Sequence, residues 1–449
     1  MGTGTVQAQG SGEAAGRRRE QRGWYFYDWA CSVYSTSVLT VFLGPYLTSV
    51  AESAADADGF VHPLGLPVRA GSFFAYSVSL SVILAVVVMP LVGGTADRTG
   101  RKKPLLGAAA YVGAAATTAM FFLDGRRYLL GGVLLIVANA AQSVAMMLYN
   151  SYLPQIAPPE ERDAVSSRGW AFGYAAGSLV LIGDLVLYSA HDAFGLSETA
   201  AVRVCLAAAG LWWGAFTLVP LRRLRDRGAA AVREATAPGL RQLAATVRDM
   251  RRHPLTLAFL LAYLVYNDGI QTVISQASVY GSQELGLGQS TLIGAVLLVQ
   301  VLAVAGALAM GRLARTYGAR RTILGSLVAW TLTLAAGYFL PAGAPGWFFV
   351  LAAGIGLVLG GSQALSRSLF SHLVPPGKEA EYFSAYEMSD RGMSWLGPLL
   401  FGVTYQLTGS YRSAIVSLVA FFVIGFALLA RVPVRRAIGE AGNPVPEKI

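Results

Sequence analysis

The stretch "GGTADRTGRKKP", from Gly93 to Pro104, sets one carboxylate among several cations in an otherwise apolar part of the sequence. Long apolar runs flank it on both sides, and only 13% of the 449 residues are charged while 54% are hydrophobic. An average soluble domain has roughly a quarter of its residues charged. The composition therefore indicates that lipid, and not water, is the main solvent of this chain.

Apolar windows of about 20 residues, each long enough to cross a hydrocarbon core of about 30 Å, recur along the whole sequence. Their cores lie near residues 25–50, 70–93, 104–123, 128–152, 168–190, 202–221, 255–280, 290–311, 322–341, 347–372, 383–407 and 412–432. A backbone in lipid has to satisfy its own hydrogen bonds, which favours helices over the alternating segments of about ten residues that a barrel needs. We expect an all-α membrane protein with twelve transmembrane helices.

A long polar interruption divides the spans into two sets of six. The expected parts are an N-terminal tail at 1–23, a six-helix bundle at 24–221, a linker at 222–254, a second bundle at 255–432 and a C-terminal tail at 433–449. Apolar residues of the linker lie opposite arginines at helical spacing, which is typical of an amphipathic helix on a membrane surface. Binding of a partner by this helix is the alternative to a plain linker.

The net charge of +10 is unevenly distributed. If the N-terminus is cytoplasmic, most of the 35 Lys and Arg residues fall in inner loops and tails. The exceptions are Arg69, Arg126, Arg127, Arg203 and Arg412 outside, and Arg367 and Arg391 within spans. This positive-inside pattern predicts a protein of the cell membrane with both termini in the cytoplasm. It also argues against nucleic acid as a partner.

The two halves resemble each other, which is typical of a duplicated transporter. "IAPPEERDAVSSRGW" follows the fourth span, and "LVPPGKEAEYFSAYEMSDRGM" follows the tenth. Gly93 and Gly100 likewise match Gly311 and Gly318, each pair coming after the second span of its half. Two repeated bundles predict a cleft between them.

The loop that starts at Gly93 resembles the G-x-x-x-D-R-x-G-R-K-K motif between helices 2 and 3 of the major facilitator superfamily. The matching residues are Gly93, Asp97, Arg98, Gly100, Arg101, Lys102 and Lys103. Four further stretches, "WYFYDWACSVYS", "YNDGIQTVISQASVYGSQELGLG", "GGSQALSRSLF" and "GPLLFGVTYQLTGS", are similar to bacterial members of its vacuole-effluxer-like family. Fungal members of that family are associated with autophagy and with amino-acid export from the vacuole.

The resemblance implies a secondary transporter that works by alternating access as a monomer in the bilayer. It further implies a small-molecule substrate and no cofactor, with a proton as the possible coupling ion. The sequence departs from the family pattern at two positions. Cys31 stands where we expect Asn, and Arg315 stands where the first copy of the loop has Asp97.

The carboxylate of the loop is predicted to act as a conformational latch. An Asp at the inner end of a helix can meet an Arg or the positive N-terminus of a neighbouring helix. A pair that exists in only one arrangement of the two halves would bias the switch between them. The expected latch residues are Gly93, Asp97, Arg98, Gly100, Arg101 and Lys102. For the cations, a role in topology alone remains the alternative.

The resemblance implies that helices 1, 4, 7 and 10 line the cavity. Each of these spans carries polar residues on one helical face. The candidates for the substrate or proton pathway are Asp28, Gln142, Tyr149, Asn267, Asp268, Gln271, Gln363 and Arg367. Bonding between membrane helices is the alternative role of such side chains.

Asp268 is the strongest of these candidates, because burying an ionisable residue in a membrane costs about 3 kcal/mol on insertion scales. It stands about 13 residues from the inner start of its span, hence roughly 20 Å deep at 1.5 Å per residue. Asn267 and Gly269 both weaken a helix, so we expect the backbone to loosen there. We predict that Asp268 exchanges a proton, and that an amphoteric substrate pairs with Asp268 and Arg367. A structural Asp bonded to a neighbouring helix is the alternative.

Charged residues also gather near the predicted inner ends of the spans. We expect a gate formed by Arg168, Glu387, Asp390 and Arg391, where Glu387 and Arg391 are spaced to pair at i and i+4. The repeated Arg-Gly in "SSRGW" and "SDRGM" puts Arg168 and Arg391 in equivalent places. Snorkelling to the membrane surface is the competing explanation.

Three other residues in the spans carry no functional expectation. Cys31 and Cys205 are expected to be small buried hydrophobes. Asp184, near the outer end of the fifth span, is expected to meet water. No cluster has the spacing of a metal site.

Sequence motifs of enzymes are absent: there is no P-loop, no HExxH and no nucleophile elbow. We therefore expect a transporter and not an enzyme. Proton-coupled export of amino acids or similar small solutes is the leading hypothesis. Export of drug-like organic cations is one alternative, and a non-transporting membrane sensor or scaffold is another.

Overall fold

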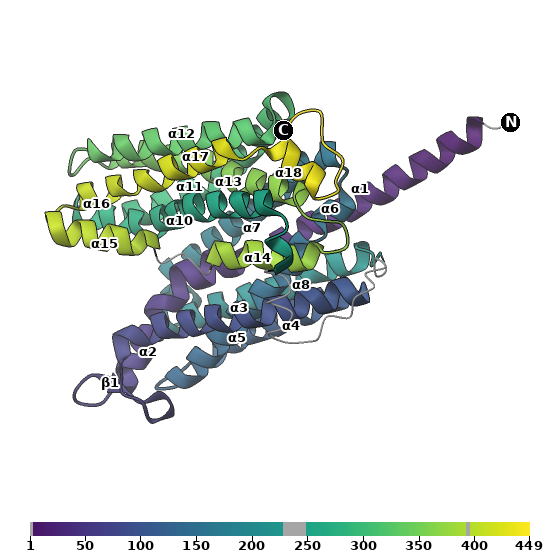
Figure 1. Cartoon of the computed structure of the whole chain (residues 1–449). Helices are drawn as coiled ribbons and strands as arrows, with labels where there is room; N and C mark the ends of the chain where they lie inside the picture. The colour runs from purple at the N-terminus through teal and green to yellow at the C-terminus, as the bar shows by residue number, and fades with distance from the viewer. Residues whose placement is uncertain (1–2, 228–247, 392–395) are drawn as a thin grey trace. The chain divides into compact units, whose positions relative to one another are not determined.

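The computed structural model describes residues 3–227, 248–391 and 396–449, and this part of the chain is almost entirely helical (Figure 1). Its strands are β1 (Phe60–Val61) and β2 (Val68–Arg69), which pair antiparallel with Phe60 opposite Arg69. They close a short hairpin between the first and second spans.

The first half of the chain contains six long helical runs. They are α1 (Thr3–Val33) continued by the π-helix η1 (Tyr34–Phe42) and α2 (Leu43–Ala54), then α3 (Phe73–Thr99), α4 (Lys102–Ala119), α5 (Tyr128–Asn150), α7 (Arg162–Ser189) and α8 (Glu198–Arg223). The short α6 (Leu153–Ile156) lies between α5 and α7, and short 3-10 turns lie at Pro63–Gly65, Ala70–Ser72, Met120–Phe122, Pro159–Glu161 and His191–Phe194.

The second half contains α10 (Pro254–Gln283), α11 (Gln289–Tyr317), α12 (Ala319–Tyr338), α13 (Pro345–His372), α14 (Glu379–Arg391), α15 (Leu396–Thr408), α16 (Tyr411–Ser417), α17 (Val419–Arg431) and α18 (Val434–Glu440). Helices α16 and α17 together form the last predicted span.

The element order agrees with the twelve predicted spans. Ten described helices are long and apolar enough to cross a membrane. The other two expected spans correspond to α12 and to the pair α14 and α15. The eleventh span corresponds to α14 and α15, which lie on either side of residues 392–395, and these four residues are outside the described part of the chain. The N-terminal tail also differs, because α1 begins at Thr3 and no proline interrupts the run before Pro45.

The chain divides into two compact units. One comprises Met1–Tyr149 with Ala175–Ala229, and the other comprises Asn150–Tyr174 with Ala230–Ile449. The segment Asn150–Tyr174 therefore packs with the second unit, although it lies within the first predicted bundle. Residues 228–247, which carry most of the predicted amphipathic linker helix, lie outside the described residues.

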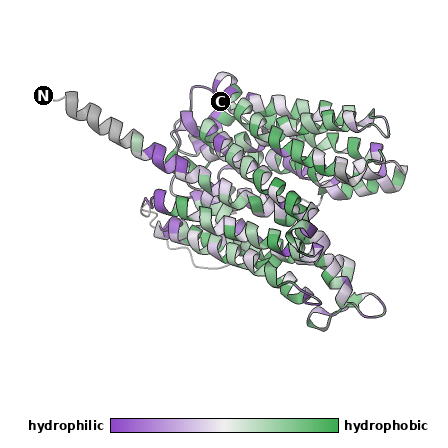
Figure 2. Cartoon of the chain, turned by 180° about the vertical axis from the view of Figure 1, so that it is seen from behind, coloured by the Kyte–Doolittle hydropathy of each residue, from purple (hydrophilic) through white to green (hydrophobic). Residues whose placement is uncertain are grey.

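Hydrophobic residues run along the helices of both units, as the green colour of the ribbons in Figure 2 shows, and large apolar side chains are exposed on them. Exposed examples are Leu179, Leu211, Leu332, Phe339 and Leu407. Exposed apolar surface on this scale would be costly in water and is typical of a protein solvated by lipid. The surface thus agrees with the composition.

Glycines allow close helix packing inside each unit. In the second unit, a Cβ on Gly306 of α11 would lie 2.2 Å from the Leu357 carbonyl oxygen of α13. A Cβ on Gly360 of α13 would lie 2.4 Å from the Ala303 carbonyl oxygen of α11. Small residues let membrane helices approach in this way, so α11 and α13 meet backbone to backbone.

The two repeated loops also depend on glycine. Gly100 ends α3 with φ +64°, and Gly318 follows α11 with φ +87°. Both angles lie in the left-handed region that favours glycine. The two halves therefore share a positive φ at the equivalent glycine, although ψ differs, at 13° for Gly100 and 152° for Gly318.

We predict that Gly360→Ala lowers the stability of the protein. The added methyl group meets a backbone oxygen that cannot move independently, and overpacking of this kind costs about 1–3 kcal/mol. Thermal unfolding in detergent measures the effect as a lower Tm. Gly325→Ala on α12 is the matched control, since its Cβ meets no atom within 4 Å. An unchanged Tm for Gly360→Ala would contradict the close contact.

Candidate functional site

Asp28 lies in a buried aromatic cluster of the first unit. Its carboxylate, on α1, is 4% exposed and accepts a hydrogen bond of 2.5 Å from the Tyr149 hydroxyl of α5. Trp24 stacks on Tyr149 with ring centroids 4.3 Å apart, and its Nε1–H donates to the Tyr149 carbonyl at 2.8 Å. The structure thus brings together two predicted pathway residues, Asp28 and Tyr149, and adds Trp24 to them.

Gln142, also on α5, lies next to the π-helical part of the first span. Its Nε2 donates to the Ser35 hydroxyl at 3.4 Å. One turn away, the Asn139 side chain donates to the Ser81 hydroxyl of α3 at 2.6 Å. A polar face of α5 therefore meets η1 and α3 within the first unit.

The carboxylate of the Gly93 loop pairs inside its own loop. Asp97 and Lys102 are both buried, with Asp97 Oδ1 3.0 Å from Lys102 Nζ. Arg98 Nε donates to the Gly94 carbonyl, and Arg101 is exposed. We expected an Arg or a helix N-terminus as the partner of Asp97 and considered Lys102 mainly as a topology signal. The pairing has a local cause, because Gly100 turns the chain so that the start of α4 faces the end of α3.

A second local contact fixes the other side of this loop. The Lys103 backbone N–H, at the start of α4, donates to the Asp226 carboxylate at 2.8 Å. An acidic group at a helix N-terminus is stabilised by the helix dipole and satisfies a free N–H. Glu20 on α1 likewise binds Arg227, with Oε2 2.5 Å from Nη2. The chain after α8 is thus tied to α1 and α4.

Arg367 of the second unit is buried and bonded through all three of its nitrogens. It lies on α13 and is 1% exposed. Its Nε and Nη2 donate to the hydroxyl and the carbonyl of Ser166, both at 2.9 Å, and its Nη1 donates to Asn150 Oδ1 at 3.2 Å. The guanidinium also lies over the Trp170 ring, 5.4 Å from the centroid. These bonds satisfy a buried charge as its desolvation requires.

Asn150 connects this arginine to a carboxylate. Its amide group donates from Nδ2 to Glu387 Oε1 of α14 at 2.6 Å while its Oδ1 accepts from Arg367. Glu387 is 4% exposed. A neutral amide thus lies between a buried cation and a buried anion. We expected Glu387 to pair with Arg391, whose side chain lies outside the described residues.

The remaining residues of the predicted gate occupy different environments. Asp390 Oδ1 accepts from Asn267 Nδ2 at 2.6 Å and from the Tyr263 hydroxyl at 3.0 Å, which joins α14 to α10. Gln363 accepts from the Tyr174 hydroxyl at 2.8 Å. Arg168 is exposed on α7, and the side chain of Arg391 lies outside the described residues, so the expected paired gate stays a prediction. The helical position of Arg168 turns it to the opposite side from Ser166.

Asp268 is buried on α10 and is 2% exposed. Its Oδ2 accepts a hydrogen bond of 2.8 Å from the Gly397 N–H at the start of α15, and its Oδ1 has no hydrogen-bond partner among the described residues. A Cβ on Gly397 would lie 1.8 Å from Thr272 Oγ1, so glycine permits this approach. Gln271 is half-buried on the same helix.

The expected loosening of the helix around Asp268 is wrong. Helix α10 is continuous over Pro254–Gln283. A Cβ on Gly269 would lie 2.8 Å from Phe421 Cβ and 3.2 Å from the Phe422 ring, so this glycine serves close packing and not a backbone break. The low helix propensity of Asn and Gly is outweighed by tertiary contacts.

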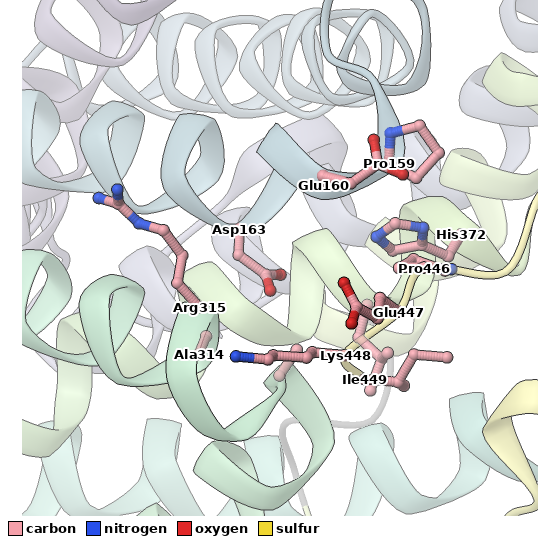
Figure 3. A pocket seen from close by; sticks show the side chains of 12 residues that line it. Pro159, Glu160, Asp163, Ala314, Arg315, His372, Pro446, Glu447, Lys448 and Ile449 are labelled. Atoms are coloured by element: carbon pink, nitrogen blue, oxygen red, sulfur yellow. The ribbon is translucent and has the colours of Figure 1, made fainter.

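A cavity of about 290 Å³ lies at one end of the second unit (Figure 3). Its wall includes Arg315, Asp163 and His372, together with the C-terminal residues 446–449. Arg315 is exposed here, so the second copy of the loop has no buried ion pair at this position like that of Asp97. Among the described residues, no group of His, Cys, Asp or Glu is arranged to hold a metal ion.

The cluster contains residues that the sequence reasoning missed. Asn150 and Ser166 hold Arg367, and Tyr263 holds Asp390. Asn150 follows the predicted pathway residue Tyr149 directly, and Ser166 lies in the repeated segment before Arg168. Their polarity within apolar sequence was the available signal.

We predict that Arg367→Lys destabilises the protein by about 1–3 kcal/mol, because one ammonium cannot replace a fork that reaches both Ser166 and Asn150. The measurement is the Tm of the purified protein in detergent. Arg321→Lys, on the exposed face of α12, is the control and should leave the Tm unchanged. Equal Tm values for the two variants would show that the hydrogen bonds of the buried Arg367 guanidinium group do not contribute to the stability of the protein.

Comparison with known proteins identifies the family. The family model "Vacuole effluxer Atg22 like" matches residues 16–442. An uncharacterized MFS-type transporter, YxiO, of Bacillus subtilis is 30% identical over 95% of this chain and 98% of its own length. Autophagy-related protein 22 of Coccidioides immitis is 27% identical over 94% of this chain and 88% of its own length.

Solved structures agree in fold. The major facilitator transporter FucP, in an outward conformation, has a TM-score of 0.68 at 14% identity, covering 92% of this chain and 98% of its own. The proton:xylose symporter XylE gives 0.68 at 14% identity, covering 93% and 95%. The protein is a multi-pass membrane transporter with the twelve-helix fold and not an enzyme. The chain belongs to the vacuole effluxer Atg22-like family of the major facilitator superfamily.

Proposed function

We propose that the protein exports amino acids or similar small solutes by alternating access, driven by a proton gradient. The observation that carries the coupling is Asp268, a carboxylate buried in a membrane helix with one bonded and one unpaired oxygen. A charged carboxylate in this position costs about 3 kcal/mol on insertion scales. A proton on the unpaired oxygen removes that cost.

Protonation of Asp268 also has a structural consequence. A neutral acid is a weaker acceptor than a carboxylate, so the bond from the Gly397 N–H weakens when the proton binds. That N–H belongs to the start of α15. Binding of the proton would therefore weaken the contact between α10 and α15 within the second unit. Ion binding could in this way be coupled to movement of these helices.

The substrate class is supported by the effluxer family and by the chemistry of Arg367. A substrate carboxylate is a strong partner for a guanidinium fork. All three donor nitrogens of Arg367 already bind Ser166 or Asn150. A carboxylate that takes these nitrogens in place of Ser166 and Asn150 would weaken the attachment of the Asn150–Tyr174 segment to α13. In this proposal, the substrate carboxylate replaces Ser166 and Asn150 as the partner of Arg367, and the same exchange opens the gate.

The remaining parts of the proposal concern placement in the cell. The excess of Lys and Arg in predicted inner loops supports a cell-membrane protein with both termini in the cytoplasm. The ion pair between Asp97 and Lys102 would then lie at the cytoplasmic side, where it stabilises the turn between α3 and α4. We propose that a monomer suffices for transport.

Reconstituted liposomes test the coupling with a panel of labelled amino acids. A difference of one pH unit is worth 1.36 kcal/mol per proton, so one coupled proton sustains about a tenfold concentration ratio of the substrate. We predict this ratio for the wild type, and a ratio of about one for Asp268→Asn, which should still exchange substrate. Asp192→Asn, 95% exposed at its side chain, is the matched control and should behave as wild type.

Each other outcome has a defined meaning. If no amino acid moves under any gradient while organic cations do, the amino-acid class is wrong. If no solute moves at all in folded, reconstituted protein, a sensor or scaffold replaces the proposed transport of these solutes. If Asp268→Asn keeps the full concentration ratio, the coupling proton binds elsewhere.

A further inference from the structure

The first span contains an unusual helical stretch beside a buried acid. Tyr34–Phe42 forms the π-helix η1. Such widened turns are rare and occur frequently at functional sites. A Cβ on Gly177 of α7 would lie 2.7 Å from Thr36 Oγ1, so glycine lets α7 approach this stretch closely. Thr36 and Gly177 both belong to the first unit.

Asp184 lies on α7 in this region, and the structure corrects the expectation that it meets water. Asp184 is only 5% exposed. Its Oδ2 has no hydrogen-bond partner among the described residues. The nearest polar side chains are the Ser37 hydroxyl of η1 and the Cys205 thiol of α8. Asp184 lies on a buried face of α7, whereas Ile182 and Val186 on the same helix are exposed.

Ser37 is a second unpartnered polar group at the same place. It is 1% exposed, and its Oγ makes no hydrogen bond within the described part of the chain. The Cys205 thiol donates to the Asp184 carbonyl, with Sγ and oxygen 3.7 Å apart, and not to the free carboxylate oxygen. Asp184 Oδ2 and Ser37 Oγ are therefore both buried near each other, and neither has a hydrogen-bond partner among the described residues.

The chemistry of these groups identifies the ligand. No Lys, Arg or His is among the groups that face Asp184 from η1 and α8 in the described residues. A bare carboxylate there is unfavourable, since buried charges need a partner. Hard metal cations require several oxygen ligands and avoid sulfur, whereas this site has one carboxylate, one hydroxyl and a thiol. A proton requires one oxygen only.

We propose that Asp184 and Ser37 form a proton-binding site in the first unit, separate from Asp268. The hydroxyl of Ser37 suits both states, because it can accept from the neutral acid and donate to the carboxylate. The proposal goes beyond the proposed function, as it depends neither on the transported solute nor on Asp268. It assigns the protein two buried protonatable carboxylates, one in each unit.

Infrared difference spectroscopy tests the proposal directly on the full-length protein in lipid bilayers. The spectrum is recorded as the pH is raised, and a protonated carboxyl group gives a C=O band that disappears on deprotonation. We expect the wild-type spectrum to include one band from Asp184 and one from Asp268. Asp184→Asn should lose one of them and Asp268→Asn the other, whereas the exposed control Asp192→Asn should keep both.

A second variant keeps the proposal testable if Asp184→Asn does not fold. Ser37→Ala retains the acid but removes the hydroxyl that we place beside it, so the Asp184 band should shift in position while the Asp268 band stays unchanged. A spectrum of folded Asp184→Asn identical to wild type would overturn the proposal. So would a Ser37→Ala spectrum without any shift.

The result is distinguishable from a failure of the proposed function. If gradient-driven flux is found but the Asp184 band is not, the inference fails and the proton-coupled transport stands. If the Asp184 band is found but no amino acid moves, the substrate class fails and the proton site stands. The two experiments therefore have separate readouts, one spectroscopic and one of solute accumulation.

Discussion

The cost of an unpaired polar group away from water governs this structure. Arg367 meets that cost with three hydrogen bonds and an aromatic face, and Asp97 meets it with the ammonium of Lys102. Asn150 contributes both of its functional groups, one to a cation and one to an anion. Polar residues are expensive in lipid, so each one that remains is tied to a neighbouring helix or left for a ligand.

Close packing of the backbone makes these ties possible. The glycines of α11 and α13 bring two helices together so that α13 can hold Arg367 within a dense interior. Gly397 has the same effect on a smaller scale, because only a residue without Cβ lets its N–H reach Asp268 past Thr272. Small residues and charged residues therefore depend on each other: the former set the distance at which the latter can bond.

The sequence predicted the elements and many of the residues, but few of their partners. Hydrophobic windows located all twelve spans, and the repeated glycines indicated two equivalent turns that the backbone contains at Gly100 and Gly318. Partners such as Asn150 and Arg367 lie on helices far apart in the chain. Helical periodicity predicts which residues share a face of one helix, but not which other helix that face contacts. Propensity misled at Gly269, where the packing of Phe421 decides the conformation. Position along the span misled at Asp184, because burial depends on surrounding helices.

Cations and anions are treated differently in the described part of the interior. The buried guanidinium of Arg367 has a partner for each of its three nitrogens, whereas Asp184 and Asp268 each keep one oxygen without a hydrogen-bond donor. An arginine cannot release its proton in a protein, so its charge has to be bonded permanently or exchanged for a charged ligand. A carboxylate has a further option, because a proton converts it into a neutral acid that burial favours. An interior with incompletely bonded acids is therefore suited to exchange protons. An anionic ligand that takes the bonded nitrogens of Arg367 has to replace Ser166 and Asn150.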